Sequence, residues 1–310
     1  MPIWESRATI RIARKLRAFL DLRAGAPPIA GGGGIEAGNI VWIFGAGRSG
    51  TTWLRDMLCS VEGYSPWEEP LVGRLFGAFH GDNADKGDAP NYILSERHRA
   101  VWLAAIRGMV LDGAGARFPE RSGGGYVVVK EPNGSRGAPL LSEALPESRV
   151  ITVVRDPRDV CASNLDGRRQ GGWLRERRAA RGRSNPKAGA EPEKLVRRLA
   201  GNCAGNMGGA VEAHRAHRGP KTLVRYEDLN EDALGAMRRI YRELELPAGE
   251  AEMVRSVERN SWANIPEEER GEGKFYRKAA PGGWRGDLTP RQVEIVEEAN
   301  ASLLEEFYGA

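Results

Sequence analysis

A glycine-rich turn is the first feature of the sequence that is able to perform chemistry. Gly45-Ala-Gly-Arg-Ser-Gly-Thr-Thr52 follows an apolar run at 39–44 and opens a helical pattern over residues 51–60. The free backbone N–H groups and the dipole of a helix N-terminus attract anions, and glycines let the backbone approach a phosphate closely. The turn therefore predicts a phosphate site.

The turn has the spacing of two phosphate-binding motifs, and neither match is complete. As G-x-G-x-x-G it needs an acidic residue at the end of a second strand, about 20 residues further on. Glu68 and Glu69 lie in a Pro- and Trp-containing stretch that does not predict a strand end. As a P-loop, the turn has Thr51 where that motif has its lysine, and Arg48 supplies a cation instead.

Arg48-Ser-Gly-Thr-Thr-Trp-Leu54 resembles the 5′-phosphosulfate loop of sulfotransferases that use 3′-phosphoadenosine 5′-phosphosulfate (PAPS). The resemblance implies that this loop holds the cofactor through Gly47, Arg48, Ser49, Gly50, Thr51, Thr52 and Trp53. The family's 3′-phosphate motif, an Arg at a strand end and a Ser eight residues later, is matched by Arg155 and Ser163. An Arg fork and a hydroxyl two turns into the next helix can converge on one phosphate. The intervening Arg158 and Asp159 are assigned to charge patterning at the start of that helix.

Two further matches lie nearer the C-terminus. Arg277-Lys-Ala-Ala-Pro-Gly-Gly-Trp-Arg285 resembles the family's R-K-G-x-x-G-[DE]-W-[KR] loop, which implies cofactor contacts for Arg277, Lys278 and Ala279. The sequence departs from the motif at Ala279 and Gly283, and Ala279 can still offer its backbone N–H if its φ stays negative. Arg225-Tyr-Glu-Asp-Leu229 resembles the R-Y-E-D-L strand end, which implies that Tyr226 lies near the cofactor. The matches together span residues 40 to 290.

The candidate catalytic groups are Glu69, Lys130 and Arg48. Sulfuryl transfer needs a base for the acceptor's proton and cations over the transferring oxygens. The strand end Lys130-Glu-Pro132 lacks the histidine of many cytosolic members and resembles the protein-tyrosine and carbohydrate type, which has a Glu some 20 residues after the loop cation. Glu69 follows Arg48 by 21 residues. The resemblance implies that Glu69 is the general base.

Each catalytic assignment has an alternative. Glu68 is the reserve base and His80 the fallback, and a solvated acidic turn is the other interpretation of Glu68 and Glu69. Lys130 and Arg48 are assigned to charge on the sulfuryl group and the leaving phosphate. Lys130 could instead form a buried pair with Glu131, because a buried charge needs a partner.

The elements that position these residues alternate along the chain. Apolar runs predict strands at 39–44, 126–130, 149–154 and 221–225, and helical patterns cover 51–60, 91–112, 138–145, 192–216, 232–244 and 290–307. We predict an α/β protein with a P-loop-type three-layer fold, in which helices cover both faces of a central parallel sheet. Residues 39–310 are expected to form one sulfotransferase domain, preceded by an amphipathic helix at 1–25 and a Gly/Pro linker at 26–38.

Composition and charge exclude several protein classes. The 310 residues include 46 Lys and Arg against 42 Asp and Glu, and a net charge of +4 does not indicate nucleic-acid binding. The three cysteines are far apart and form no CxxC, which argues against a disulfide framework and a structural zinc site. No apolar run approaches the ~18 residues of a membrane span, and the N-terminus lacks a signal-peptide hydrophobic region. We expect a cytoplasmic protein.

Three segments keep two interpretations each. The basic amphipathic pattern at 3–22 either packs on the domain or makes peripheral contact with an anionic membrane. Residues 168–187 hold seven Arg and one Lys against one acid, and form either a solvated loop or a segment that recognises an anionic or membrane-surface acceptor. Aromatic residues between 64 and 122 are expected to line the acceptor pocket or to join the core; they are Trp67, Phe76, Phe79, Tyr92 and Trp102.

The sequence thus predicts a sulfotransferase that moves the sulfuryl group of PAPS to a hydroxyl or amine by in-line displacement. The product nucleotide is adenosine 3′,5′-bisphosphate (PAP), and the reaction needs no metal because PAPS has no β/γ-phosphate pair to bridge. The acceptor is expected to be a small molecule, a carbohydrate or lipid-like. The alternatives are a P-loop kinase or NTP-binding enzyme with a modified Walker A motif, and a non-catalytic nucleotide-binding module.

Overall fold

The computed structural model describes residues 34–180, 182 and 192–309. The chain from Ile35 onward forms one compact unit. The predicted N-terminal helix, residues 26–33 of the predicted linker, and residues 181 and 183–187 of the Arg-rich segment lie outside the described residues. Within the described part, no helix is both long and apolar enough to cross a bilayer.

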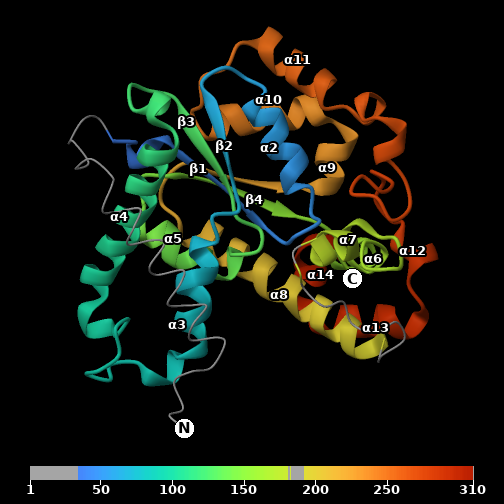
Figure 1. Ribbon diagram of the computed structural model, residues 1–310, viewed down its shortest axis with the longest axis horizontal. Helices are drawn as coiled ribbons and strands as arrows, with labels where there is room; N and C mark the ends of the chain where they lie inside the picture. Colours follow the sequence, from blue (N-terminus) through green and yellow to red (C-terminus); the bar gives the residue numbers. More distant parts are fainter. Residues whose placement is uncertain (1–33, 181, 183–191, 310) are drawn as a thin grey trace. The chain divides into compact units, whose positions relative to one another are not determined.

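Five parallel strands form the central sheet in the order β2–β3–β1–β4–β5 (Figure 1). They are β1 (Ile40–Gly45), β2 (Tyr64–Glu68), β3 (Tyr126–Lys130), β4 (Arg149–Val154) and β5 (Lys221–Arg225). The three inner strands are nearly continuous runs of buried apolar residues, as expected where helices cover both faces of a parallel sheet. The predicted α/β fold is confirmed.

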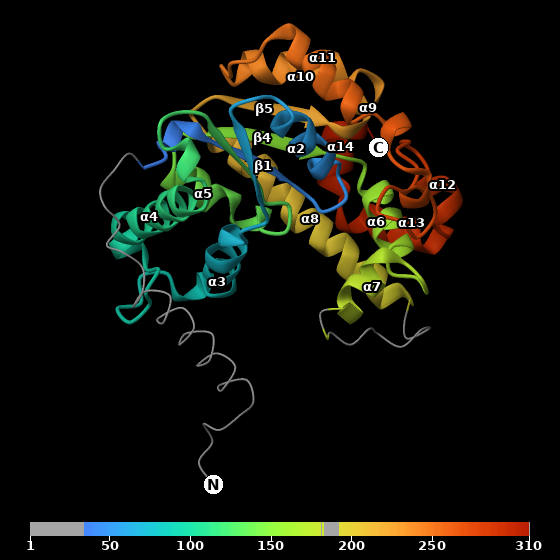
Figure 2. The ribbon, with the colours of Figure 1, turned by 45° about the horizontal axis from the view of Figure 1, so that its top comes forward.

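Successive residues of β1 belong to opposite layers. Trp42 and Phe44 pack in a core with α4 (Arg99–Arg117), α5 (Ala138–Ala144) and α8 (Pro192–Ala216). Val41 and Ile43 pack in a second core with α2 (Thr51–Cys59), α10 (Ala233–Glu243) and α11 (Glu250–Arg259). The side chains of a strand alternate between its faces, so one strand joins both layers. Figures 1 and 2 show these helix layers on either side of the sheet.

The remaining helices gather near the carboxyl ends of the strands or bridge the layers. They are α3 (Phe79–Asp82), α6 (Pro157–Asp166), α7 (Trp173–Ala180), α9 (Tyr226–Glu231), α12 (Trp284–Asp287), α13 (Pro290–Ala299) and α14 (Ala301–Tyr308). Short turns of helix are η1 (Ala37–Asn39), η2 (Arg74–Ala78), η3 (Ala84–Lys86), η4 (Glu96–His98), η5 (Pro119–Arg121), η6 (Ser135–Gly137), η7 (Trp262–Asn264) and η8 (Glu267–Glu269). The helix predicted at 290–307 is two helices that meet at Asn300, whose buried side chain donates to the carbonyl of Val296 (2.9 Å).

The stretch that was not expected to end a strand does so. Tyr64–Glu68 is β2, and its residue Glu68 pairs with Lys130 of β3. Pro66 is tolerated because β2 lies at the edge of the sheet, where a missing N–H leaves no neighbouring strand unpaired. The end of β2 thereby places Glu68 and Glu69 beside the ends of β3 and β1.

Candidate active site

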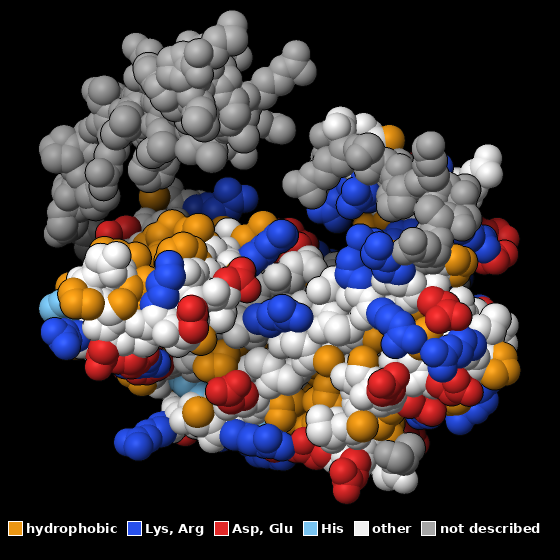
Figure 3. Space-filling model, turned by 90° about the horizontal axis from the view of Figure 1, so that it is seen from below, with side chains coloured by type: hydrophobic (Ala, Val, Ile, Leu, Met, Phe, Trp, Pro, Cys, Tyr) orange, Lys and Arg blue, Asp and Glu red, His pale blue; other side chains and the backbone are white. Residues whose placement is uncertain are grey.

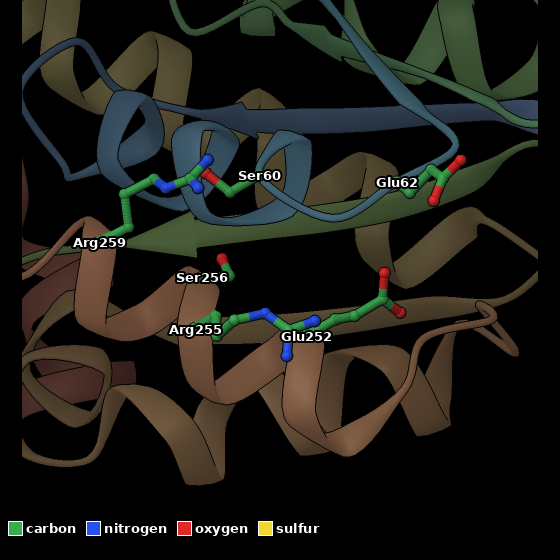
Figure 4. Close-up of a pocket in the computed structure, with 6 residues that line it drawn as sticks. All are labelled: Ser60, Glu62, Glu252, Arg255, Ser256 and Arg259. Atoms are coloured by element: carbon green, nitrogen blue, oxygen red, sulfur yellow. The ribbon is translucent and has the colours of Figure 1, made fainter.

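A cavity of about 690 Å³ lies at the carboxyl edge of the sheet. Every predicted site residue except Ser49 lines it, and the glycine turn, the ends of β2, β3 and β4, α6 and the loop at 275–283 all contribute. Ser49 is buried and donates its hydroxyl to the carbonyl of Ala46 (2.7 Å) within the turn. A second cavity of about 140 Å³, between the end of α2 and α11, contains none of the predicted residues (Figure 4).

Two glycines are required by the geometry of the turn. A Cβ at Gly45 would lie 2.5 Å from the carbonyl oxygen of Val153, and one at Gly50 would lie 2.6 Å from the ring of Tyr226. Gly50 has φ +92° and precedes α2 without a side-chain cap. The first N–H groups of the helix are therefore not satisfied by a capping side chain, as an anion-binding turn requires.

Arg48, Arg155 and Ser163 meet beneath Tyr226. The Nε of Arg48 donates to Oγ of Ser163 (3.0 Å), and Nη1 of Arg155 donates to the carbonyl of Arg48 (2.9 Å). The guanidinium of Arg155 lies 4.0 Å from the centre of the Tyr226 ring. Residues that the sequence places in three separate motifs are thus in direct contact.

Aromatic rings cover the guanidinium of Arg48. Its Cζ lies 4.6 Å from the ring centre of Phe275 and 5.2 Å from that of Trp173, and Nη2 donates to the Phe275 carbonyl (2.6 Å). Burial, followed by the neighbouring charge of Arg155, lowers the pKa of Arg48 to about 10. The side chain of Arg48 is turned toward Ser163. The sequence had assigned it, together with Lys130, to the charge on the sulfuryl group.

The Arg48–Arg155 pair has the properties of an anion site. Among the described residues no carboxylate forms an ion pair with either side chain, and Nε of Arg155 is buried without a hydrogen-bond partner. Two adjacent, half-buried cations repel each other and lose part of their hydration, a cost that a bound dianion offsets. The residues present therefore fit a phosphate-bearing cofactor.

Lys130 and the two glutamates form a paired group on the other side of the cavity. Nζ of Lys130, with 4% of its side chain exposed, lies 2.7 Å from Oε1 of Glu68 and 3.2 Å from Oε1 of Glu69. It also donates to Oγ1 of Thr52 (3.1 Å). Asn133 donates to the other oxygen of Glu69 (2.8 Å), and Glu68 also pairs with Arg55.

The loop at 277–284 is held by acidic residues. Lys278 (3.0 Å) and Arg277 both pair with Asp287, and the buried Asp159 accepts from the N–H groups of Gly282 (2.7 Å) and Trp284 (2.9 Å). Asp159 lies in the first turn of α6, as its assignment to charge at the helix start expects, and it also fastens the loop to α6. Arg158 does bind locally, to the helix-capping Asp156.

Ala279 does not have the negative φ under which it was expected to offer its backbone N–H to the cofactor. Its φ is +48°, in the left-handed region that favours glycine. The family's glycine at this position suits that conformation, and alanine adopts it here at a steric cost.

The sequence and the fold were compared with known proteins. The model of the Sulfotransferase family matches residues 41–250, more than half of the chain. The chain belongs to the sulfotransferase family. No protein of curated function matches its sequence.

Three solved structures share the fold of this sulfotransferase at low identity. Mouse sulfotransferase SULT7A1, complexed with PAP, is 13% identical, with 87% of this chain and 86% of that chain covered and a TM-score of 0.54. Sulfotransferase STF9 from Mycobacterium avium is 18% identical (97% and 84% covered, TM-score 0.53). Retinol dehydratase in a complex with retinol and PAP is 16% identical (88% and 82% covered, TM-score 0.52).

The predicted acceptor-pocket aromatics do not line the cavity of this sulfotransferase. Tyr92 and Trp102 are buried in the core beside α4, Trp67 and Phe76 pack against that core, and Phe79 is exposed on α3. The fallback base His80 also lies away from the cavity, 3.6 Å from Glu96. Trp67, Phe76, Tyr92 and Trp102 belong to the core that α4 covers, which is away from the cavity.

Other lining residues were missed in the sequence. Asn260, Ser261, Trp262 and Ile265 line the cavity beside Trp53, whose indole donates to the Asn260 carbonyl (2.8 Å). They carry no motif, and only the fold brings them to α2. Among the described residues, no cluster of three or more His, Cys, Asp or Glu is placed to hold a metal ion.

Glu131 was expected only as an alternative partner of Lys130. In the structure Lys130 pairs with Glu68 and Glu69 instead. Glu131 is fully buried behind the site, and its Oε2 accepts from the N–H of Leu71 (2.9 Å). Burial is the main cause that raises its pKa to about 7. The carboxylate ties the turn after Glu69 to the end of β3.

Proposed function

We propose that this sulfotransferase transfers the sulfuryl group of PAPS to a hydroxyl or amine of an acceptor, with Glu69 as the general base. The observation that carries the proposal is the half-buried pair of Arg48 and Arg155, which has no carboxylate partner in the described chain and shares a cavity with Lys130 and Glu69. Bound PAPS supplies the activated sulfuryl group and a phosphate as leaving group.

Arg155, Ser163 and Arg48 are assigned to the 3′-phosphate of the nucleotide. The guanidinium of Arg48 donates to Ser163, and that of Arg155 donates to the backbone carbonyl of Arg48, so the three residues lie together at one end of the cavity. Charge-assisted hydrogen bonds from guanidinium groups suit a dianion at that point. Tyr226 stacks on Arg155 and orients it.

Lys130 and Thr52 are assigned to the other end of the nucleotide. The ammonium of Lys130 lies between Thr52, at the start of α2, and Glu69. It can stabilise negative charge that develops where the helix N-terminus also points. Arg48 is directed elsewhere, so we assign this charge to Lys130 without it.

Glu69 is positioned to accept a proton from the acceptor. Its two oxygens are held by Lys130 and Asn133, and 24% of its side chain remains exposed at the cavity wall. Fixed orientation of a base toward the reacting proton is what general-base catalysis requires. Glu68, which is more exposed and shared between Arg55 and Lys130, remains the reserve.

Nucleotide titration by calorimetry tests the cofactor assignment. We expect PAP to bind at least tenfold more tightly than adenosine 5′-phosphate, without Mg²⁺, because only PAP carries the 3′-phosphate that Arg155 and Ser163 face. Equal affinities would contradict the assignment. Transfer from ³⁵S-labelled PAPS to a panel of hydroxyl and amine acceptors then distinguishes the enzyme from a non-catalytic nucleotide-binding module.

A further inference from the structure

A second group of cations lines the same cavity, beyond Ser163. Arg168 follows the end of α6, and Arg177 lies on α7; both contribute to the cavity wall. They belong to the described part of the Arg-rich segment. Figure 3 shows Lys and Arg side chains gathered on the side of the molecule that carries α7.

Arg168 and Arg177 differ from neighbouring arginines in their partners. Arg158 pairs with Asp156, and Arg169 pairs with Glu272 and Asp166. In the described ranges no carboxylate forms an ion pair with Arg168 or Arg177. Nη1 of Arg168 donates a long hydrogen bond to Oδ1 of Asn164 (3.4 Å). Acidic residues of the described ranges therefore do not neutralise these two cations.

The second group and the nucleotide cations have different charged neighbours. Burial lowers the pKa of Arg168, and the charges that lower it further are those of Arg198 and Arg178. For Arg48, the corresponding charges are those of Arg155 and Arg277. Two positive regions therefore occupy one cavity, and a single nucleotide phosphate does not account for both.

Apolar side chains line the cavity together with the second group. Trp173 and Leu174, at the start of α7, line the wall, and the ring of Trp173 lies 4.9 Å from that of Phe275. An acceptor in this part of the cavity therefore has aromatic rings, an aliphatic side chain and guanidinium groups in its wall. A wall of this kind suits an amphipathic anion.

We propose that the acceptor carries an anionic group, a carboxylate, sulfate or phosphate, that binds Arg168 and Arg177 while its apolar body packs against Trp173 and Leu174. This inference rests on the proposed function, because it assigns the remainder of the cavity to the molecule that receives the sulfuryl group. The acceptor is thus a small hydroxyl- or amine-bearing anion.

A matched pair of fluorescent probes tests the site without turnover. 8-Anilinonaphthalene-1-sulfonate carries an anionic group, and N-phenyl-1-naphthylamine has the same rings without it. With the enzyme saturated with PAP, we expect the sulfonate to bind about tenfold more tightly, the effect of a charge-assisted hydrogen bond. Displacement by 2-naphthoate, 2-naphthyl sulfate and 2-naphthyl phosphate then ranks the three anionic groups.

The variants locate the effect on the two arginines. Arg168→Gln combined with Arg177→Gln should abolish the preference for the sulfonate and leave the affinity for the neutral probe unchanged. Arg177→Gln alone should lower the preference for the sulfonate over the neutral probe about threefold. Because Arg177 is exposed, this variant is not expected to disturb folding. Arg197→Gln, which removes an exposed arginine of α8 outside the cavity, is the matched control.

The failure of this inference is distinguishable from failure of the proposed function. If PAP binds but the two probes bind equally well, or if Arg197→Gln lowers the preference as much as the double variant, the anionic site is overturned and the sulfotransferase assignment stands. If PAP does not bind, the cofactor assignment fails, while the probe comparison on the nucleotide-free enzyme still tests the arginines.

Discussion

The two walls of the cavity handle charge in opposite ways. On the β2–β3 wall, Lys130 is paired with Glu68 and Glu69, and Asn133 binds the remaining oxygen of Glu69. On the β4–α6 wall, Arg48, Arg155 and Arg168 have no carboxylate partner in the described parts of the chain. The paired wall holds its groups in place without a ligand, whereas the unpaired wall gains stability when an anion arrives.

This difference separates two tasks. A base must already be oriented when the acceptor enters, and hydrogen bonds from Lys130 and Asn133 orient Glu69. A binding site for a highly charged cofactor benefits from cations that are not neutralised beforehand. Substitutions on the two walls should therefore affect different measurements.

Removal of the proposed base should give the largest effect. We expect Glu69→Gln to lower kcat by roughly 10² or more, the usual contribution of a general base, and to leave PAP affinity unchanged. Single-turnover transfer from labelled PAPS and calorimetry with PAP measure the two quantities. Glu68→Gln is the matched control on the same wall, and a larger loss in that variant would move the base to Glu68.

A substitution on the β4–α6 wall should weaken nucleotide binding. Arg155→Ala should weaken PAP binding by roughly 30-fold, because a charged hydrogen-bond donor is lost from a buried anion site. Affinity for adenosine 5′-phosphate should change little. An equal loss for both nucleotides would show that Arg155 supports the loop and does not bind the 3′-phosphate.

Loss of the hydrogen bonds that Asp159 accepts from the 277–284 loop, here called the Asp159 clamp, should weaken PAP binding less than loss of Arg155 does. Asp159→Ala removes the acceptor for the N–H groups of Gly282 and Trp284, and we expect faster amide exchange at these residues with about tenfold weaker PAP binding. Asp159→Asn keeps one carbonyl oxygen and should retain part of the protection. Unchanged exchange in the alanine variant would exclude the clamp.

The buried Glu131, behind the paired wall, should affect stability more than function. Its pKa of about 7 lies above the ordinary value of 4.5, so between these pH values the folded protein holds a proton that the unfolded chain has lost. Stability from this group is therefore complete below pH 4.5 and is lost as the pH rises through 7. A change of 1 kcal/mol moves the melting temperature of a chain of this size by about 2–4 °C.

Glu131→Gln removes this titration and keeps an oxygen for the Leu71 N–H. The melting temperature of the variant relative to the native protein should rise by at least a few degrees between pH 5 and pH 8. A pH-independent difference would mean that Glu131 is already ionised at pH 5 in the fold.

Local sequence was sufficient for the features that lie on consecutive residues. The glycine turn at 45–50 and the buried strands follow from short-range chemistry, and the fold they predict is confirmed. β2 was missed because its proline and few apolar residues form a strand only beside β3. The loop contacts of Asp159 and the role of Glu131 were missed because their partners are determined by tertiary contacts, and the same holds for the aromatic residues that joined the core.

The aromatic cover of Arg48 has a consequence for ionic strength. Rings of Phe275 and Trp173 keep mobile ions away from this guanidinium, whereas Arg177 is exposed. Salt screens exposed charges over a Debye length of about 10 Å at 0.1 M and acts much less on buried ones. Raising the salt concentration should therefore weaken the anionic probe at Arg177 well before it weakens PAP, so that one titration with potassium chloride tells the two positive regions apart.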